Sequence, residues 1–402
     1  MSIIRDVTIE AKKYLEDDYI LLFIGARQSG KTTVLKQLQQ FLNEKQKTVY
    51  FLNLEDPEWL GLLNKSPKNL FKIFTIDLHQ KNFLIIDEIQ YLSNPTNFLK
   101  YFWDEYKDRI KIIASGSSAF YIDRKFKDSL VGRKKIFYVR TLSFREFLRF
   151  KNENELSKKD FHQIGLADQQ KLAVYYNEYI IYGGYPRVVL SPLSEKEDVL
   201  RDIAYSYIKK DIYESNIRQD EVFYRLFKIL ASQIGNLVNS SELANTLGCS
   251  KTSIDNYLYV MQKSFHINLI KPFFRNIRKE LTRMPKIYFW DLGLRNFFLS
   301  NFKGINLRQD QGQLLENAVF RELAEKHPIE KIKFWRTIQK NEVDFVINGN
   351  LAYEVKVDSK QFRISRYKKF LENYPKIELL LVSLKSEGSF INNCRVIKPW
   401  DI

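Results

Sequence analysis

The chain has 402 residues, of which 45% are hydrophobic and 14% aromatic, so it can bury cores in two or three domains and is not a disordered chain. Its formal net charge of +16 favours an acidic partner, nucleic acid and DNA in particular, over a membrane surface, although a lysine-rich soluble surface gives the same charge. The apolar runs are too short to span a membrane, which leads us to expect a cytoplasmic protein.

The first predicted elements are an amphipathic helix over residues 3–15 and a strand over Ile20–Ile24. The strand leads into a loop that fits G-x-x-x-x-G-K-[ST], namely Gly25-Ala26-Arg27-Gln28-Ser29-Gly30-Lys31-Thr32. A helical pattern begins at Thr33, so the loop meets a helix N-terminus, where free N–H groups attract phosphate. We expect residues 25–33 to bind ATP, with Lys31 on the β- and γ-phosphates and Thr32 on Mg²⁺. A chance match in an ordinary strand-turn-helix is the alternative.

After a strand over Thr48–Leu54, a short apolar run from Phe83 ends in two acids, Asp87 and Glu88. Such a run is typical of a parallel strand that is buried on both faces. Its carboxyl end would meet the phosphates, where Asp87 can hold Mg²⁺ and Glu88 can orient or deprotonate the attacking water. The alternative is a strand that leads into a solvated acidic turn.

Two further candidates follow the second helix of this region, predicted over Phe98–Tyr106. A strand from Ile110 ends in small hydroxyl residues, and Ser117 or its neighbour Ser118 would sense the γ-phosphate, unless they only form a turn. Arg133 precedes a strand and would act as an arginine finger, in its own chain or on a neighbouring copy in a homo-oligomer. An ordinary surface arginine is the alternative.

In order, several segments resemble a prokaryotic family of AAA-type ATPases that carry a C-terminal restriction-endonuclease-like domain of unknown function. These segments are Gly25–Thr32, Ile85–Gln90, Ser115–Ser118, Gly132-Arg133, Leu142–Phe147, Tyr182–Arg187 and Pro285–Gly293. The resemblance implies a P-loop nucleotide-binding core, a helical lid, a winged-helix middle and a nuclease-like end.

The middle of the chain begins with a charged stretch over Lys151–Lys171, which indicates a lid or linker, and helical patterns follow. Asn239 and Gly248 bound one short helix and Ser250 begins the next, a helix-turn-helix pattern that offers Lys251, Thr252 and Ser253 to a DNA groove. The basic residues after it suggest a wing that tracks phosphates: Arg275, Arg278, Lys279, Arg283 and Lys286. A module that only packs between domains is the alternative.

The C-terminal stretch predicts a helix from Gln311 that carries Glu316, and a hairpin around Asn348-Gly349-Asn350. A three-residue loop keeps one face apolar and places Asp344 opposite Glu354, with Lys356 on the same side. Opposed carboxylates need compensation, which Mg²⁺ would supply, leaving Lys356 to activate a water. This arrangement resembles the PD-(D/E)xK nuclease fold, although Val343 replaces the proline. Simple salt bridges with Lys356 and Arg336 are the alternative.

We therefore expect an α/β multidomain protein: an AAA-type P-loop ATPase core over 1–150, a helical lid over 151–220, a winged helix over 221–300 and a restriction-endonuclease-like α/β domain over 301–402. The expected function is an ATPase that couples its nucleotide state to nucleic-acid binding or processing. The alternative is a nucleotide-controlled scaffold with an inactive nuclease-like domain. Cys249 and Cys394 are far apart and form no motif, in keeping with a reducing compartment.

Overall fold

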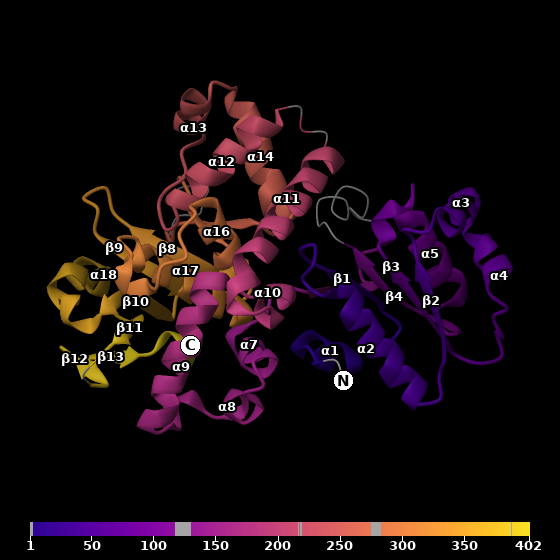
Figure 1. The fold of residues 1–402 in the computed structure, drawn as a ribbon, viewed down its shortest axis with the longest axis horizontal. Helices are drawn as coiled ribbons and strands as arrows, with labels where there is room; N and C mark the ends of the chain where they lie inside the picture. Colours follow the sequence, from indigo (N-terminus) through magenta and orange to yellow (C-terminus); the bar gives the residue numbers. More distant parts are fainter. Residues whose placement is uncertain (1–2, 117–129, 216, 218, 275–282, 387) are drawn as a thin grey trace. The chain divides into compact units, whose positions relative to one another are not determined.

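The computed structural model describes residues 3–116, 130–215, 217, 219–274, 283–386 and 388–402 (Figure 1). The chain forms two compact units. The first comprises Met1–Thr141 with Lys263–Phe265, and the second comprises Leu142–Gln262 with His266–Ile402. Helix α7 (Phe144–Phe150), which we expected at the end of the first domain, therefore lies in the second unit.

A fully parallel sheet with strand order β2-β3-β4-β1-β5 forms the centre of the first unit. Its strands are β1 (Ile20–Ile24), β2 (Thr48–Asn53), β3 (Asn82–Asp87), β4 (Ile110–Gly116) and β5 (Lys134–Tyr138). The helices are α1 (Asp6–Lys12), α2 (Lys31–Glu44), α3 (Pro57–Lys65), α4 (Leu70–Ile73) and α5 (Pro95–Tyr106). The predicted strands and the α/β class are confirmed.

Different helices bury the two faces of this sheet. In β1, Ile20, Leu22 and Ile24 share a core with residues of α3, α4 and α5, whereas Leu21 and Phe23 share one with α1 and α2. Because both faces are covered, the central strands are continuous apolar runs, the pattern that a parallel sheet requires.

Helices, a two-stranded sheet and a six-stranded sheet form the second unit. After α7 come α8 (Asn154–Lys158), α9 (Leu166–Tyr182), α10 (Pro186–Leu190), α11 (Lys196–Glu214), α12 (Asp220–Ser232), α13 (Ser240–Leu247), α14 (Lys251–Lys263), α16 (Leu292–Phe298), α17 (Gln311–Lys326) and α18 (Lys368–Asn373). Over the ranges that the structure describes, no helix combines the length and apolar character needed to cross a membrane.

The predicted pair of short helices is present. The Asn239 side chain accepts hydrogen bonds from the N–H groups of Ser241 and Glu242 and so caps α13. Gly248 ends the helix with a φ of 67°, the left-handed conformation that favours glycine. Ser250 Oγ accepts from Ser253 N–H at 3.0 Å at the start of α14. An antiparallel pair, β6 (Ile267–Ile270) and β7 (Lys286–Phe289), follows.

The C-terminal sheet has the order β12-β13-β11-β10-β9-β8, and α17 packs on β10. Its strands are β8 (Ile332–Arg336), β9 (Glu342–Ile347), β10 (Leu351–Asp358), β11 (Glu378–Lys385), β12 (Phe390–Ile391) and β13 (Cys394–Ile397). Phe345 pairs with Tyr353 and Ile347 with Leu351. This register confirms the three-residue loop, because continuing it by one step sets Asp344 opposite Glu354.

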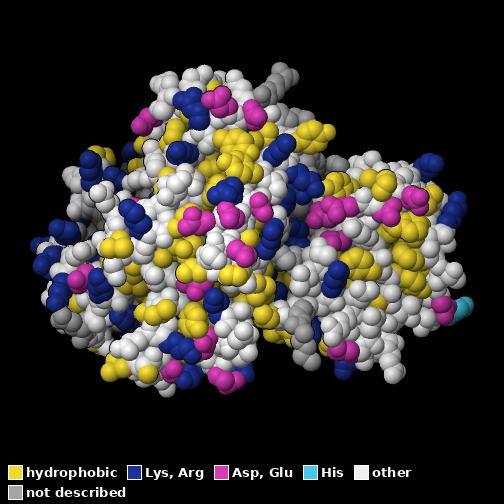
Figure 2. Space-filling model, viewed as in Figure 1, with side chains coloured by type: hydrophobic (Ala, Val, Ile, Leu, Met, Phe, Trp, Pro, Cys, Tyr) yellow, Lys and Arg dark blue, Asp and Glu magenta, His cyan; other side chains and the backbone are white. Residues whose placement is uncertain are grey.

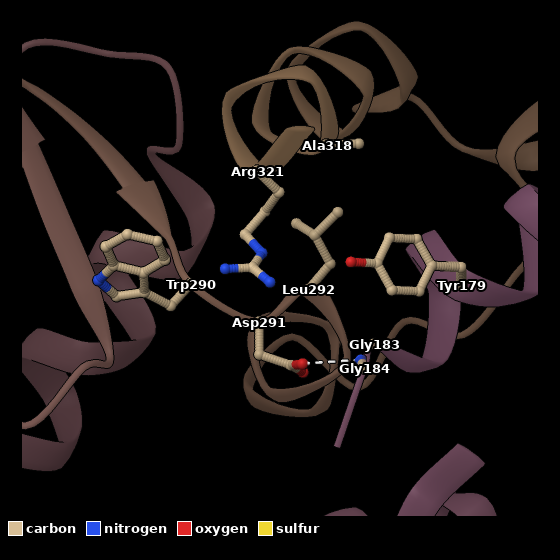
Figure 3. Close-up of a pocket in the computed structure, with 8 residues that line it drawn as sticks. All are labelled: Tyr179, Gly183, Gly184, Trp290, Asp291, Leu292, Ala318 and Arg321. Carbon is tan, nitrogen blue, oxygen red and sulfur yellow. Dashed lines mark hydrogen bonds between the residues drawn. The ribbon is translucent and has the colours of Figure 1, made fainter. Parts of the chain in front are cut away.

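The turn at Gly183-Gly184 closes a small cavity between α9, α16 and α17 (Figure 3). Asp291 accepts hydrogen bonds from Gly184 N–H at 2.8 Å and from Leu294 N–H at 3.0 Å. Gly183 has a φ of 77°, and a Cβ there would lie 2.1 Å from Asp291 Oδ1. A glycine is therefore needed at position 183, where the turn passes close to Asp291. The residues around the cavity pack α9, α16 and α17 together.

Candidate functional site

The glycine-bounded loop lies between the end of β1 and the start of α2, as predicted. A Cβ on Gly25 would lie 1.9 Å from the carbonyl oxygen of Val139, so the first glycine lets the loop pass close to the backbone after β5. Gly30 has a φ of 99° and precedes the first residue of α2, Lys31. The two glycines thus fix the turn that aims the helix N-terminus at the loop.

Lys31 lies against the loop itself. Its side chain is buried, and its Nζ donates to the carbonyl oxygens of Ala26 at 2.8 Å and Gly25 at 3.1 Å. These carbonyls hold the ammonium beside the loop. Phosphate oxygens would compete with them for the same donor.

The hydroxyl and the acid predicted to hold Mg²⁺ lie together. Thr32 Oγ1 donates to Asp87 Oδ2 at 2.6 Å, although the two residues come from α2 and β3. The other oxygen of Asp87 accepts from the Ser115 hydroxyl at the end of β4. A hydroxyl beside a carboxylate is a hard oxygen donor set of the kind that Mg²⁺ prefers, so these residues fit that ion.

Glu88 follows β3 directly and has a left-handed backbone, with φ 56° and ψ 47°. This conformation costs a non-glycine residue about 1–2 kcal/mol. Its N–H donates to Asp87 Oδ1 and to Ser115 Oγ, each at 3.2 Å, and its carboxylate accepts from the Gln90 amide. The strained turn is therefore held through the Glu88 backbone by Asp87 and Ser115, and the Glu88 carboxylate is held by Gln90.

Arg133 does not approach the phosphate loop of its own chain. Its carbonyl oxygen accepts from Ile20 N–H at 2.8 Å, at the first residue of β1, while the loop follows the last residue of that strand. Its guanidinium pairs with Asp104 at 3.1 Å and stacks on Trp103. A finger role within one chain is therefore wrong, and action on a neighbouring copy stays a prediction. Ser117 and Ser118 lie outside the described residues.

Two residues that contact the site were missed from the sequence. The Ser115 hydroxyl donates to Asp87, the last residue of β3, and accepts from the Glu88 N–H. Its position near the end of β4, next to β3, was the available signal. Arg5 is 4% exposed, and its guanidinium donates to the carbonyl oxygens of Ser29 at 2.7 Å and Arg140 at 2.9 Å. Nothing in the local pattern around Arg5 indicated that it supports the loop.

The C-terminal acids also come together, but around a lysine. Lys286 Nζ lies 3.0 Å from Glu316 Oε1, 2.5 Å from Glu342 Oε1 and 3.8 Å from Asp344 Oδ1. The prediction that Lys286 tracks phosphates from a wing is wrong, because its side chain is 1% exposed. Arg283, three residues earlier in the sequence, is exposed, and Arg275, Arg278 and Lys279 lie outside the described residues.

The predicted roles of Glu354 and Lys356 change accordingly. Lys356 Nζ donates to Glu354 Oε1, and Asp344 Oδ2 accepts from Val355 N–H at 2.8 Å. Burial, together with the charge of Asp344, raises the pKa of Glu354 to about 8. Among the described residues, no group of three or more His, Cys, Asp or Glu side chains is arranged to hold a metal ion. The Mg²⁺ site expected at Asp344 and Glu354 therefore stays a prediction.

Comparisons with known proteins agree with the nucleotide site. A family model described as an AAA domain matches residues 17–148. Two domains of unknown function, DUF8612 and DUF4143, match residues 174–305 and 311–400. The AAA-type resemblance is thus confirmed for the first unit, while the C-terminal match names no nuclease.

Two relatives are similar to this chain over most of its length. An uncharacterized protein of Methanocaldococcus jannaschii is 29% identical, over 96% of this chain and 85% of the relative. One from Haemophilus influenzae is 27% identical, over 77% of this chain and 76% of the relative. The AMPPCP-bound structure of DnaA from Aquifex aeolicus is 14% identical and covers 65% of this chain and 89% of that chain, with a TM-score of 0.31.

Proposed function

We propose that the protein binds ATP with Mg²⁺ at the loop of residues 25–33 and hydrolyses it. The observation that supports this most is the 2.6 Å hydrogen bond between Thr32 Oγ1 and Asp87 Oδ2, since it joins the two side chains whose oxygens suit the metal. The lysine of the same loop lies beside them, within an AAA domain.

Each residue has a distinct part in this proposal. The N–H groups at the start of α2 bind the phosphates, and Lys31 exchanges its carbonyl partners for β- and γ-phosphate oxygens. Thr32 and Asp87 would hold Mg²⁺, which neutralises charge on the phosphate oxygens when bound. Glu88 accepts the proton of the attacking water while Gln90 holds its carboxylate, and Ser115 keeps Asp87 and the Glu88 backbone in register.

We further propose that the nucleotide state controls the affinity of the second unit for nucleic acid. The start of α14 exposes Lys251 and Thr252, and β6 and β7 stand where a wing follows a helix-turn-helix. The net charge of +16 favours a polyanionic partner. On the face shown in Figure 2, Lys and Arg side chains are spread among Asp and Glu, so we expect the contact to be built from single basic residues such as Lys251.

A second candidate is a nucleotide-controlled scaffold that binds protein. It is favoured by the way lysines pair with the acids of the C-terminal sheet. If the C-terminal sheet were an active restriction-endonuclease-like domain, Asp344, Glu354 and Lys356 would carry the chemistry with Mg²⁺. Lys356 is bonded to Glu354, and Lys286 lies among the neighbouring acids. We therefore propose that this domain has the layout of a nuclease without its activity.

A paired measurement tests the coupling. Phosphate release from ATP and the affinity for a labelled duplex are followed in ATP, in a non-hydrolysable analogue and in ADP, at several salt concentrations. We expect ATP turnover, and a duplex affinity that differs between analogue and ADP and falls with salt. Lys251→Ala should weaken duplex binding and lower its salt dependence, while the exposed lysine of α12, changed in Lys228→Ala, serves as the matched control.

The outcomes separate the two candidates. Turnover without any duplex binding would favour the scaffold, and no turnover would remove the ATPase proposal itself. Plasmid incubated with the protein, Mg²⁺ and ATP should stay intact. Cutting that Asp344→Ala abolishes would instead show an active nuclease.

A further inference from the structure

We propose that Lys286 is a built-in cation that takes the place of a divalent metal ion in the acidic cluster of the C-terminal sheet, formed by Glu316, Glu342 and Asp344. The nuclease resemblance calls for a metal at Asp344 and Glu354, and the Lys286 ammonium, from the two-stranded β6–β7 sheet, lies 3.8 Å from the first of these acids. The inference deepens the second candidate function, because it gives a physical reason for an inactive nuclease-like domain.

The geometry around the ammonium is that of a filled cation site. Three carboxylates from two elements, α17 and β9, face one Nζ atom at 2.5, 3.0 and 3.8 Å. The lysine side chain is 1% exposed, and the three acids are 11–25% exposed. Acids that were gathered for a metal would need several oxygens within about 2.1 Å of one point, and the lysine already occupies the space between them.

Charge explains why the lysine stays ionised there. Burial alone would lower the pKa of Lys286, but the carboxylates of Glu316, Asp344 and Glu342 raise it above its ordinary value. Arg336 pairs with the other oxygen of Glu342 at 3.0 Å, and Tyr288 donates to Glu316 at 2.6 Å. Lys286 and Arg336 thus offset two of the three carboxylate charges, and Tyr288 donates a hydrogen bond to Glu316.

The backbone of β7 holds the ammonium in this position. Lys286 and Tyr288 are two residues apart on the strand, so both side chains leave the same face, and both reach Glu316. The Asn317 side chain, one residue along α17, accepts from Phe289 N–H at 2.7 Å and donates to the Phe289 carbonyl at 2.9 Å. The strand is therefore joined to α17 through Lys286, Tyr288 and Phe289.

The test measures Mn²⁺ binding to the full-length protein without nucleotide, by the loss of free Mn²⁺ signal in electron paramagnetic resonance. We expect no ion bound in the C-terminal cluster of the parent protein at micromolar Mn²⁺. Lys286→Met removes the charge at similar length, and we expect it to bind one additional Mn²⁺ at least tenfold more tightly than the parent does. The exposed lysine before β8, changed in Lys331→Met, is the matched control and should leave binding unchanged.

Two further variants keep the test decisive. Combining Lys286→Met with Glu316→Gln should abolish the gained binding. The double variant has the same net charge as the parent, so it can also be used if the single variant folds poorly. Parent protein that binds Mn²⁺ in a manner abolished by Asp344→Asn would overturn the proposal, as would a folded Lys286→Met that gains no binding. ATP turnover is measured separately and should be the same in Lys286→Met and the parent, so a failed ATPase proposal is distinguished from a failed cation proposal.

Discussion

Asp87 at the end of β3 accepts hydrogen bonds from two hydroxyls, Thr32 and Ser115, whereas Asp344 in the C-terminal sheet shares a buried ammonium with Glu316 and Glu342. These hydroxyl partners are neutral, so under the proposed function the charge of Asp87 would be available to the Mg²⁺ that binds with the nucleotide. Lys286 instead supplies the charge from within the chain. The fixed partners of the acids are thus neutral hydroxyls in the first region and a cation in the second.

The largest effect is expected from Glu88→Gln, which sharpens the comparison on the nucleotide side. The amide keeps the size of the side chain but cannot accept the proton of the water, so kcat for ATP should fall about 10²–10³-fold. ATP affinity should stay unchanged, because the loop and α2 bind the phosphates. Phosphate release and nucleotide titration measure the two quantities, and the exposed acid at the start of α3, changed in Glu58→Gln, is the control. Equal losses in both quantities would contradict the assigned role.

The next effect concerns a second buried charge network, which no proposed ligand contacts. The stability lost when one of its charges is removed gives a reference for the Lys286 cluster. Asp310 pairs with Arg295 at 2.5 Å and with Arg308 at 2.8 Å, and both arginines are buried. Asp310→Asn should lower the free energy of unfolding by about 3 kcal/mol, because it leaves buried guanidinium groups without their acid. Chemical denaturation measures this, and Asp198→Asn, in an exposed pair with Arg201, should cost under about 1 kcal/mol.

The same network predicts an acid dependence. Burial alone would raise the pKa of Asp310, but Arg308 and Arg295 lower it from 3.8 to about 2. An acid with a lowered folded pKa contributes stability above its ordinary pKa and loses it as the pH falls toward the folded value. Stability should thus drop between about pH 4 and pH 2, and the drop should be smaller in Asp310→Asn. An equal acid dependence in both proteins would contradict this assignment.

A smaller effect is expected from Ser115→Ala, which removes the hydroxyl that holds both Asp87 and the Glu88 backbone. The lost hydrogen bonds are worth about 1–2 kcal/mol, so kcat should fall roughly tenfold while the fold is kept. Phosphate release is the measurement. The exposed serine before α5, changed in Ser93→Ala, should behave like the parent. An unchanged kcat would mean that Asp87 is positioned without Ser115.

The smallest effect is expected from Arg5→Gln, which breaks the bonds from α1 to the carbonyl oxygens of Ser29 and Arg140. The loop should loosen, so that ATP binds a few-fold more weakly and unfolding requires about 1–2 kcal/mol less. Nucleotide titration and denaturation measure these changes. Lys13→Gln, at an exposed position just after α1, should change neither.

Local patterns predicted what depends on neighbours in the sequence. The loop of residues 25–33 is set by its own glycines and the helix after it, and the hairpin register around Asn348–Asn350 follows from the need to keep one face apolar. The structure has the loop and the hairpin register where the sequence predicts them.

Contacts between distant segments were not predictable in this way. Lys286 stands in a basic stretch that indicates an exposed surface, and only the docking of β7 on α17 brings it to Glu316 and Glu342. We expected Arg133 beside the nucleotide from its position in the sequence. In the parallel sheet it lies beside the start of β1, whereas the loop follows the end of that strand. Whether a charged side chain is buried depends on which element packs over it, and a single sequence does not show this.

The most direct test compares Lys31→Ala with Lys36→Ala, an exposed lysine one turn further along the same helix. We predict that Lys31→Ala lowers ATP turnover by at least about 10²-fold, since it removes the positive charge that stabilises the phosphates, whereas Lys36→Ala leaves turnover unchanged. If Lys31→Ala binds and hydrolyses ATP as well as the parent protein, ATP is not bound at this loop, and the proposed function is wrong.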